Sequence, residues 1–287
     1  MRLLTRGSAT TKSIAPRRRL TVSGWVGAGL LGIILLVASA PRLFTRADPQ
    51  GGDITARLAP PSPGHALGTD HLGRDLLARL VYGARSSLLV AVTSVGGAVG
   101  VGVTLGLAAG FYGRGIDTTI MRVVDVFLAF PGILLALALV AVFGAGVGSV
   151  IAALILVSWT QYARVVRAAT LAEKGREYVA AARTIGAGDL HIVVRHILPN
   201  VSSPVVILAT LGMGSAVVAE STLSFLGMGV PPPAPSWGWT LAFGTRYLRD
   251  APHIATFSGL AIMATVLGFN LLGDGVRDLL DPRFRPQ

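Results

Sequence analysis

The sequence predicts an all-α integral membrane protein with six transmembrane helices. Hydrophobic residues make up 52% of the 287 residues and charged residues only 14%, and the mean hydropathy of +0.65 is too high for an ordinary soluble domain. The charged residues flank long uncharged runs, each of which can cross a bilayer as a helix. The net charge of +11 therefore indicates membrane topology signals, and nucleic acid is not expected as a partner.

The N-terminal part is predicted to hold a basic tail, one membrane helix and an outer loop. Residues 1–19 are polar and carry six Lys and Arg residues, which is typical of a cytoplasmic tail. The uncharged run 20–41 is long enough for one membrane helix. Ala38-Ser39-Ala40 imitates a signal-peptidase site, but the length of the run favours a retained helix. The polar loop 42–85 then lies on the extracytoplasmic side.

Residues 86–276 form the predicted membrane core. Its first uncharged run contains glycines four residues apart, which allow close contact with a neighbouring helix. A later uncharged run, 126–163, is too long for one helix, and the glycine-rich stretch 143–149 divides it into two. The predicted order is a second helix at 86–110, a polar turn at 112–122, third and fourth helices within 126–163, a fifth helix at 204–227, a sixth at 254–273 and a cytoplasmic tail at 277–287.

The distribution of Lys and Arg predicts that both termini are cytoplasmic. With the N-terminus inside, the inner segments hold 17 Lys and Arg residues and the outer segments hold 8. An excess of these residues is typical of cytoplasmic loops. This orientation places the polar interval between the fourth and fifth helices, residues 177–200, in the cytoplasm.

This interval reads EYVAAARTIGAGDLHIVVRHILPN and predicts two short helices joined by a glycine turn. The segment 178–185 is alanine-rich and favours a helix, and Gly186 and Gly188 interrupt it. A second helical piece is expected from Asp189 until Pro199 closes it. The interval is too polar to span a bilayer and must lie beside it.

The interval resembles the cytoplasmic coupling loop, the EAA loop, of ABC importer permeases. Ala180 stands where the general pattern of that family has Glu, so a salt bridge from this position is not expected. His196 before Ile-Leu-Pro-Asn is usual in the dipeptide and oligopeptide branch, and the segments HALGTDHLGRDLLARLVYGARSSLL, ESTLSFLGMGVPPPAPSWG and GDGVRDLLDPR resemble the same branch. The residues that match the pattern in register are Ala181, Ala182, Gly186, Leu198 and Pro199.

The resemblance implies a type I ABC importer permease fold with a cytoplasmic coupling helix. It implies the pore-forming subunit of an ATP-driven importer of di- or oligopeptides in the cytoplasmic (inner) membrane. The implied partners, besides the lipid bilayer, are a second homologous permease, one or two P-loop ATPase subunits and an extracytoplasmic substrate-binding protein. In that picture Ala181, Ala182 and Gly186 shape the coupling helix, Arg183 and Asp189 contact the ATPase, and Leu198 and Pro199 anchor the hairpin to the fifth helix.

The chain is predicted to have no catalytic residue and to bind no cofactor or metal. Its only lysines, Lys12 and Lys174, do not stand in the GxxxxGK[ST] motif of P-loop ATPases. ATP and Mg²⁺ would therefore bind to the partner ATPase subunits. The side chains of His65, Asp70, His71 and Asp75 could form a metal cluster, but the resemblance alone explains the Gly-Thr-Asp and Gly-Arg-Asp elements that contain the two aspartates.

Glu220 is the only acidic residue well inside a predicted span. A charged side chain at mid-membrane costs about 2.5–3.5 kcal/mol on insertion scales, so it is expected to face protein or a water-filled path. Two interpretations stay open: Glu220 belongs to the translocation path, or it hydrogen-bonds a neighbouring helix. The substrate also stays open between peptides, nickel and another small solute, and an ion-coupled secondary transporter is the alternative class.

Overall fold

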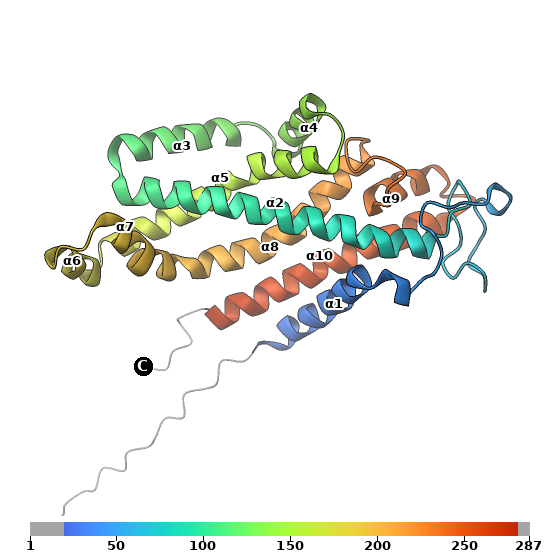
Figure 1. The fold of residues 1–287 in the computed structure, drawn as a ribbon, viewed down its shortest axis with the longest axis horizontal. Helices are drawn as coiled ribbons and strands as arrows, with labels where there is room; N and C mark the ends of the chain where they lie inside the picture. The colour runs from blue at the N-terminus through green and yellow to red at the C-terminus, as the bar shows by residue number, and fades with distance from the viewer. Residues whose placement is uncertain (1–19, 281–287) are drawn as a thin grey trace, which may run out of the picture.

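The computed structural model describes residues 20–280, so the predicted tail 1–19 and residues 281–287 lie outside the described residues. The described part is built from helices (Figure 1), and its β-structure consists of isolated bridges in the loop between residues 52 and 75. The predicted all-α class is therefore confirmed. The helices are α1 (Val22–Ser39), α2 (Leu76–Tyr112), α3 (Arg114–Leu128), α4 (Gly132–Phe143), α5 (Val147–Lys174), α6 (Glu177–Thr184), α7 (Asp189–Ile192), α8 (Leu198–Phe225), α9 (Trp237–Arg246) and α10 (Pro252–Leu280), with 3-10 turns at Pro41–Leu43 and Ile54–Ala56 and a π-helix at Val193–Ile197.

Within residues 20–280, five helical segments are long and apolar enough to cross a membrane, and a sixth span is formed if α3 and α4 are counted together. These two helices meet at an angle of 90°. The predicted third helix, which was expected to begin near residue 126, therefore starts earlier, at Arg114, and is bent. The bend lies at Pro131, because proline disfavours helical geometry in the residue before it and cannot donate a backbone hydrogen bond. The predicted polar turn at 112–122 is also mostly helical, since the left-handed Gly113 (φ +68°) reverses the chain directly into α3.

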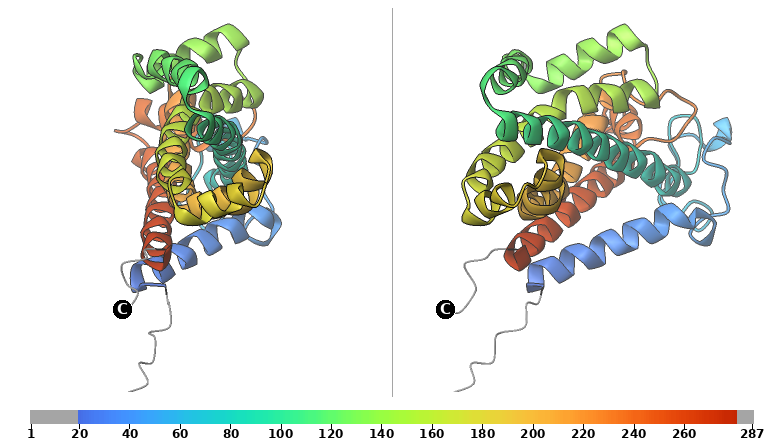
Figure 2. Two further views of the ribbon diagram at one scale, coloured as in Figure 1. Left: turned by 90° about the vertical axis from the view of Figure 1, so that its left-hand side faces the viewer. Right: turned by 60° about the vertical axis from the view of Figure 1, so that its left-hand side comes forward.

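The long helices α2, α5, α8 and α10 run along the longest dimension of the molecule (Figure 1). α1 lies beside α10 on one side of this bundle, and α3 and α4 lie on the opposite side. The further views in Figure 2 show the short helices α6 and α7 at one end and the loop that precedes α2 at the other. The two predicted polar regions thus occupy opposite ends of the bundle.

Close contact between α2 and α5 depends on three glycines spaced four residues apart. A Cβ atom at Gly102 would lie 2.5 Å from the Tyr162 Cβ, and one at Gly106 would lie 2.7 Å from the Ala163 carbonyl oxygen. A Cβ at Gly110 would lie 2.6 Å from the Thr170 Cβ. Only glycine fits at these distances, so the predicted packing role is confirmed for these three positions.

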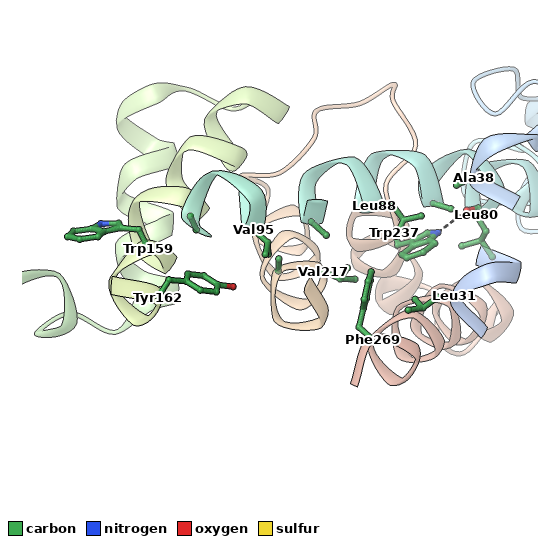
Figure 3. Close-up of a cluster of buried hydrophobic side chains, with 14 of the residues drawn as sticks. Leu31, Ala38, Leu80, Leu88, Val95, Trp159, Tyr162, Val217, Trp237 and Phe269 are labelled. Atoms are coloured by element: carbon green, nitrogen blue, oxygen red, sulfur yellow. Dashed lines mark hydrogen bonds between the residues drawn. The ribbon is translucent and has the colours of Figure 1, made fainter. Parts of the chain in front are cut away.

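The largest hydrophobic cluster joins all the long helices (Figure 3). Trp159 and Tyr162 contribute from α5, Val95 and Leu88 from α2, and Phe269 from α10. At the end of the bundle away from α6 and α7, the buried Trp237 donates a hydrogen bond from Nε1 to the Leu80 carbonyl oxygen (2.8 Å). This bond ties α9 to α2, so the short helix α9 is part of the core.

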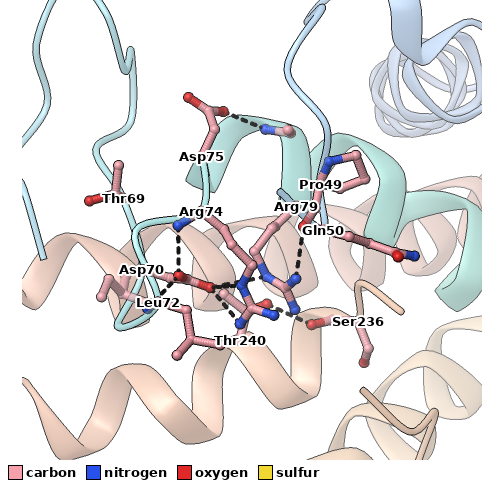
Figure 4. Close-up of polar contacts among 12 residues, drawn as sticks. Pro49, Gln50, Thr69, Asp70, Leu72, Arg74, Asp75, Arg79, Ser236 and Thr240 are labelled. Carbon is pink, nitrogen blue, oxygen red and sulfur yellow. Dashed lines mark hydrogen bonds and ion pairs between the residues drawn. The ribbon is translucent and has the colours of Figure 1, made fainter. Parts of the chain in front are cut away.

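The predicted outer loop is shorter than expected because α2 begins at Leu76, not at residue 86. Asp75 caps the helix by accepting a hydrogen bond from the Ala78 backbone N–H (2.8 Å). A buried ion cluster joins the preceding residues to the first turn of α2 (Figure 4). In it, the loop residue Arg74 has its Nε 2.7 Å from Asp70 Oδ2, and the α2 residue Arg79 has its Nε 3.4 Å from the same oxygen. Asp70 therefore organises the loop through arginine contacts. At the other end of the chain, α10 continues to Leu280, past the predicted start of the tail at 277.

Candidate functional site

The interval 177–200 folds as a helical hairpin that projects from one end of the bundle (Figure 1). α6 ends at Thr184, and α7 begins at Asp189. The turn between them requires Gly186, whose φ of +83° is in the left-handed region that residues with a Cβ avoid. The predicted order of helix, glycine turn and helix is confirmed.

One face of the hairpin is buried against the ends of α2, α5 and α8. Val179 and Ala182 of α6 pack in a hydrophobic cluster with Phe111 of α2 and with Ile192 and Ile197. This cluster fixes the rotation of α6 about its own axis. Ala182, one of the predicted coupling residues, is therefore directed into the protein.

The other face of the hairpin is exposed. Ala181, Arg183 and Asp189, all predicted coupling residues, lie on it. The Arg183 guanidinium also lies 5.5 Å from the centre of the Phe111 ring, a cation–π contact within the chain. Arg183 is thus held in place by α2 and still exposed to a partner.

The tip of the hairpin carries exposed apolar side chains that were not among the predicted coupling residues. Ile185 is 84% exposed and Leu190 is 76% exposed, and Val194 follows one turn after Leu190 at 54%. Large apolar side chains with this exposure mark a contact surface for another protein or for the membrane, and Leu190 and Val194 lie at the start of the candidate span Asp189–Phe225. The sequence signal was the interruption of a polar segment by these residues.

The base of the hairpin is closed by hydrogen bonds. Tyr178 Oη donates to Glu173 Oε2 (2.5 Å), and Asn200 Nδ2 donates to Tyr178 Oη (3.2 Å). Burial and the Glu173 carboxylate raise the pKa of Tyr178 to about 12, so its hydroxyl stays a neutral donor near neutral pH. These bonds join the end of α5 to the beginning of α8.

The second arm of the hairpin was predicted to end at Pro199, but the helix continues past this residue. α7 continues through the π-helix into α8, and Leu198 and Pro199 form the first turn of α8. Pro199 has no N–H to donate, and the helix passes this point as a π-helix, in which the Leu198 N–H donates to the Val193 carbonyl oxygen. Pro204 lies inside α8 as well. The hairpin is therefore a rigid extension of the fifth span.

Glu220 is fully buried in α8, and its carboxylate accepts hydrogen bonds from four serine hydroxyls. The shortest is from Ser224 on the same helix (2.7 Å). Ser87 of α2 and Ser236, which precedes α9, each donate at 3.1 Å. This arrangement joins α8, α2 and the residue that precedes α9 in the half of the bundle away from the hairpin, and it satisfies the carboxylate without solvent.

The chain is similar to known membrane transport components. Residues 102–286 match the family described as "Binding-protein-dependent transport system inner membrane component". The chain is 41% identical, over 91% of its length and 86% of the relative's, to the dipeptide transport system permease protein DppC of Alkalihalophilus pseudofirmus. It is 43% identical to the di/tripeptide transport system permease protein DppC of Pseudomonas aeruginosa, over 90% of this chain and 88% of that one. It is 46% identical to the glutathione transport system permease protein GsiD of Pectobacterium atrosepticum, over 78% and 75%.

A solved structure shares the fold. A chain of the MetNI methionine ABC transporter, in an inward-facing conformation, superposes with a TM-score of 0.57 at 21% identity and covers 71% of this chain and 96% of that one. The predicted permease fold is confirmed by this likeness.

Proposed function

Because the chain belongs to the family of binding-protein-dependent transport system inner membrane components, we propose that it is the pore-forming permease subunit of an ATP-driven importer of short peptides. The family consists of membrane subunits, and the sequence has no P-loop, so ATP is hydrolysed by another subunit. Two of the relatives described above are named for dipeptides or tripeptides and one for glutathione, itself a small peptide. These names favour a peptide over nickel or another small solute.

The observation that carries the proposal is the projecting hairpin with its exposed apolar tip. A transport subunit without an ATP site needs a mechanical connection to the subunit that has one. Ile185 and Leu190 supply apolar contact area, and Arg183 and Asp189 supply charges at its edge. We assign this surface to the ATPase, with Ala181 exposed beside it.

The remaining predicted coupling residues act inside the hairpin. Ala182 packs against the cluster around Phe111, and Gly186 allows the turn. Leu198 and Pro199 make the hairpin continuous with α8. A displacement of the tip would therefore move α8 as well, because no flexible linker separates them.

The proposal places the protein in the cytoplasmic membrane with the hairpin and both termini inside. The excess of Lys and Arg in these segments supports this orientation. A second, homologous permease would complete the pore, and an extracytoplasmic binding protein would deliver the peptide to the end formed by α9 and the loop before α2. ATP and Mg²⁺ would stay on the ATPase subunits.

The test is purification of the tagged chain in gentle detergent, followed by reconstitution into proteoliposomes. We expect a second six-span permease and one or two P-loop ATPases to co-purify, and peptide uptake to require ATP and the binding protein. Uptake that a proton gradient drives in the absence of ATP would refute the proposal and favour a secondary transporter.

A further inference from the structure

A cavity of about 150 Å³ lies among α2, α4, α5 and α8, apart from the coupling hairpin and the Glu220 cluster. It is located near the midpoints of α5 and α8. Its walls combine small residues with four polar side chains and contain no charged residue. The polar side chains are those of Ser158, Gln161, Tyr162 and Ser215.

Tyr162 contributes a buried hydroxyl that has no hydrogen-bond partner within residues 20–280. The side chain is fully buried, and its ring extends from α5 towards α8 (Figure 3). Gly212 leaves room for this hydroxyl, because a Cβ atom at position 212 would lie 2.3 Å from the Tyr162 Oη. A hydroxyl left unpaired in an apolar interior costs about 1–3 kcal/mol, so a polar group from outside the chain is expected to pair with it.

Two polar side chains stand at the mouth of the cavity although it lies in a membrane-spanning part of the chain. Gln161 and Ser215, one on each side of the cavity, are both exposed, beside apolar side chains such as Ile133 of α4. A primary amide facing lipid tails would leave its donors and acceptors unpaired. The Gln161 amide is therefore expected to pair with a polar group from outside the chain.

We propose that this cavity is a contact point of the translocation path, at which the Tyr162 hydroxyl and the Gln161 amide hydrogen-bond the backbone amide groups of the passing peptide. The inference rests on the proposed function. The uncharged lining suits the main-chain amide, which all peptides share, and does not select for a charged side chain. The small residues Gly132, Ala136 and Ala219 leave room for one backbone amide group of the peptide at this contact point.

The first experiment measures ATP-dependent peptide uptake by the reconstituted complex at saturating binding protein. Tyr162→Phe removes only the hydroxyl, and we expect maximal uptake to fall about fivefold, which corresponds to about 1 kcal/mol for one hydrogen bond. Thr265→Val is the control, because the buried Thr265 hydroxyl in α10 donates to the Ala261 carbonyl oxygen and does not line the cavity. This control should keep the wild-type rates of peptide uptake and of peptide-free ATP hydrolysis.

The second experiment tests contact directly and uses the absence of cysteine from this chain. Gln161→Cys should react with a peptide substrate that carries a thiol-reactive group, at least tenfold faster in the presence of ATP and binding protein. Leu35→Cys, exposed on α1, should not react faster under these conditions.

The outcomes separate this inference from the proposed function. If the wild-type complex takes up peptide with ATP but Tyr162→Phe transports normally and Gln161→Cys reacts no faster than Leu35→Cys, the cavity is not on the path and only the inference is overturned. If the wild-type complex shows no ATP-dependent peptide uptake, the proposed function fails and the inference fails with it.

Discussion

Replacement of Gly186 should uncouple ATP hydrolysis from uptake to a degree set by the backbone of the substituted residue. An added Cβ would meet no atom within 4 Å, so alanine adds no clash, and its cost is the left-handed backbone alone, about 1–2 kcal/mol. That cost shifts the equilibrium between the native turn and other conformations by about 5- to 30-fold. Asparagine tolerates this conformation and should cost less.

Proline at position 186 should have the largest effect. Its ring holds φ near −65°, roughly 150° from the observed +83°, so the turn cannot form. The hydrogen bond from the Gly186 N–H to the Arg183 carbonyl oxygen (3.0 Å) is lost as well.

The assay compares peptide uptake per ATP hydrolysed in proteoliposomes, with the membrane-inserted amount of each variant as the control. We expect Gly186→Asn to be close to the wild type, Gly186→Ala to be intermediate, and Gly186→Pro to insert normally but to lose uptake. Insertion should be unaffected because the turn lies outside the spans. Wild-type uptake by the proline variant would show that the hairpin does not transmit motion.

Three further predictions concern the tip, the buried carboxylate and the outer ion cluster. Leu190→Asp should abolish co-purification of the ATPase, whereas Ile54→Asp, exposed on the outer loop, should retain it. Glu220→Ala should lower the melting temperature in detergent because four serine hydroxyls lose their acceptor. Glu220→Gln keeps an acceptor, so its melting temperature should fall less. A stable glutamine variant that fails to transport would instead place Glu220 on the translocation path. Asp70→Asn should destabilise the protein by about 3–5 kcal/mol, since two buried arginines lose their charge partner, and Asp48→Asn, on the exposed part of the loop, should leave the melting temperature unchanged.

The hairpin could be predicted from the sequence because its signals are local. Alanines favour the first arm, and Gly186 marks the turn by a conformational requirement that the neighbouring residues do not change. The face of α6 that is buried could not be predicted, since Val179 and Ile185 are both apolar and only contact with Phe111 distinguishes them. The exposed tip was missed for this reason.

The surroundings of Glu220 and the shape of the third span depend on distant parts of the chain. Ser87 and Ser236 reach the carboxylate from other helices, and no spacing along the sequence indicates that they meet there. Pro131 was a visible signal for a break, but hydropathy measures only whether a run can enter a membrane, not whether it is straight. The lengths of the apolar runs therefore indicated the number of spans better than their geometry.

The contact between α2 and α5 connects the coupling hairpin with the mid-membrane cavity. At the hairpin end, Phe111 of α2 lies against Arg183, and Gly110 packs on Thr170. Two turns along α2, Gly102 packs against Tyr162, whose hydroxyl is at the cavity. Because helix backbones in direct contact cannot slide without a clash, a force applied at the hairpin tip should move α2 and α5 as one body. The shape of the cavity would then change because its other walls, α4 and α8, move relative to α2 and α5. Of these walls, α4 is joined to α3 through Pro131, at the bend of the third span. We therefore expect the close α2–α5 packing to carry a displacement of the hairpin to the cavity.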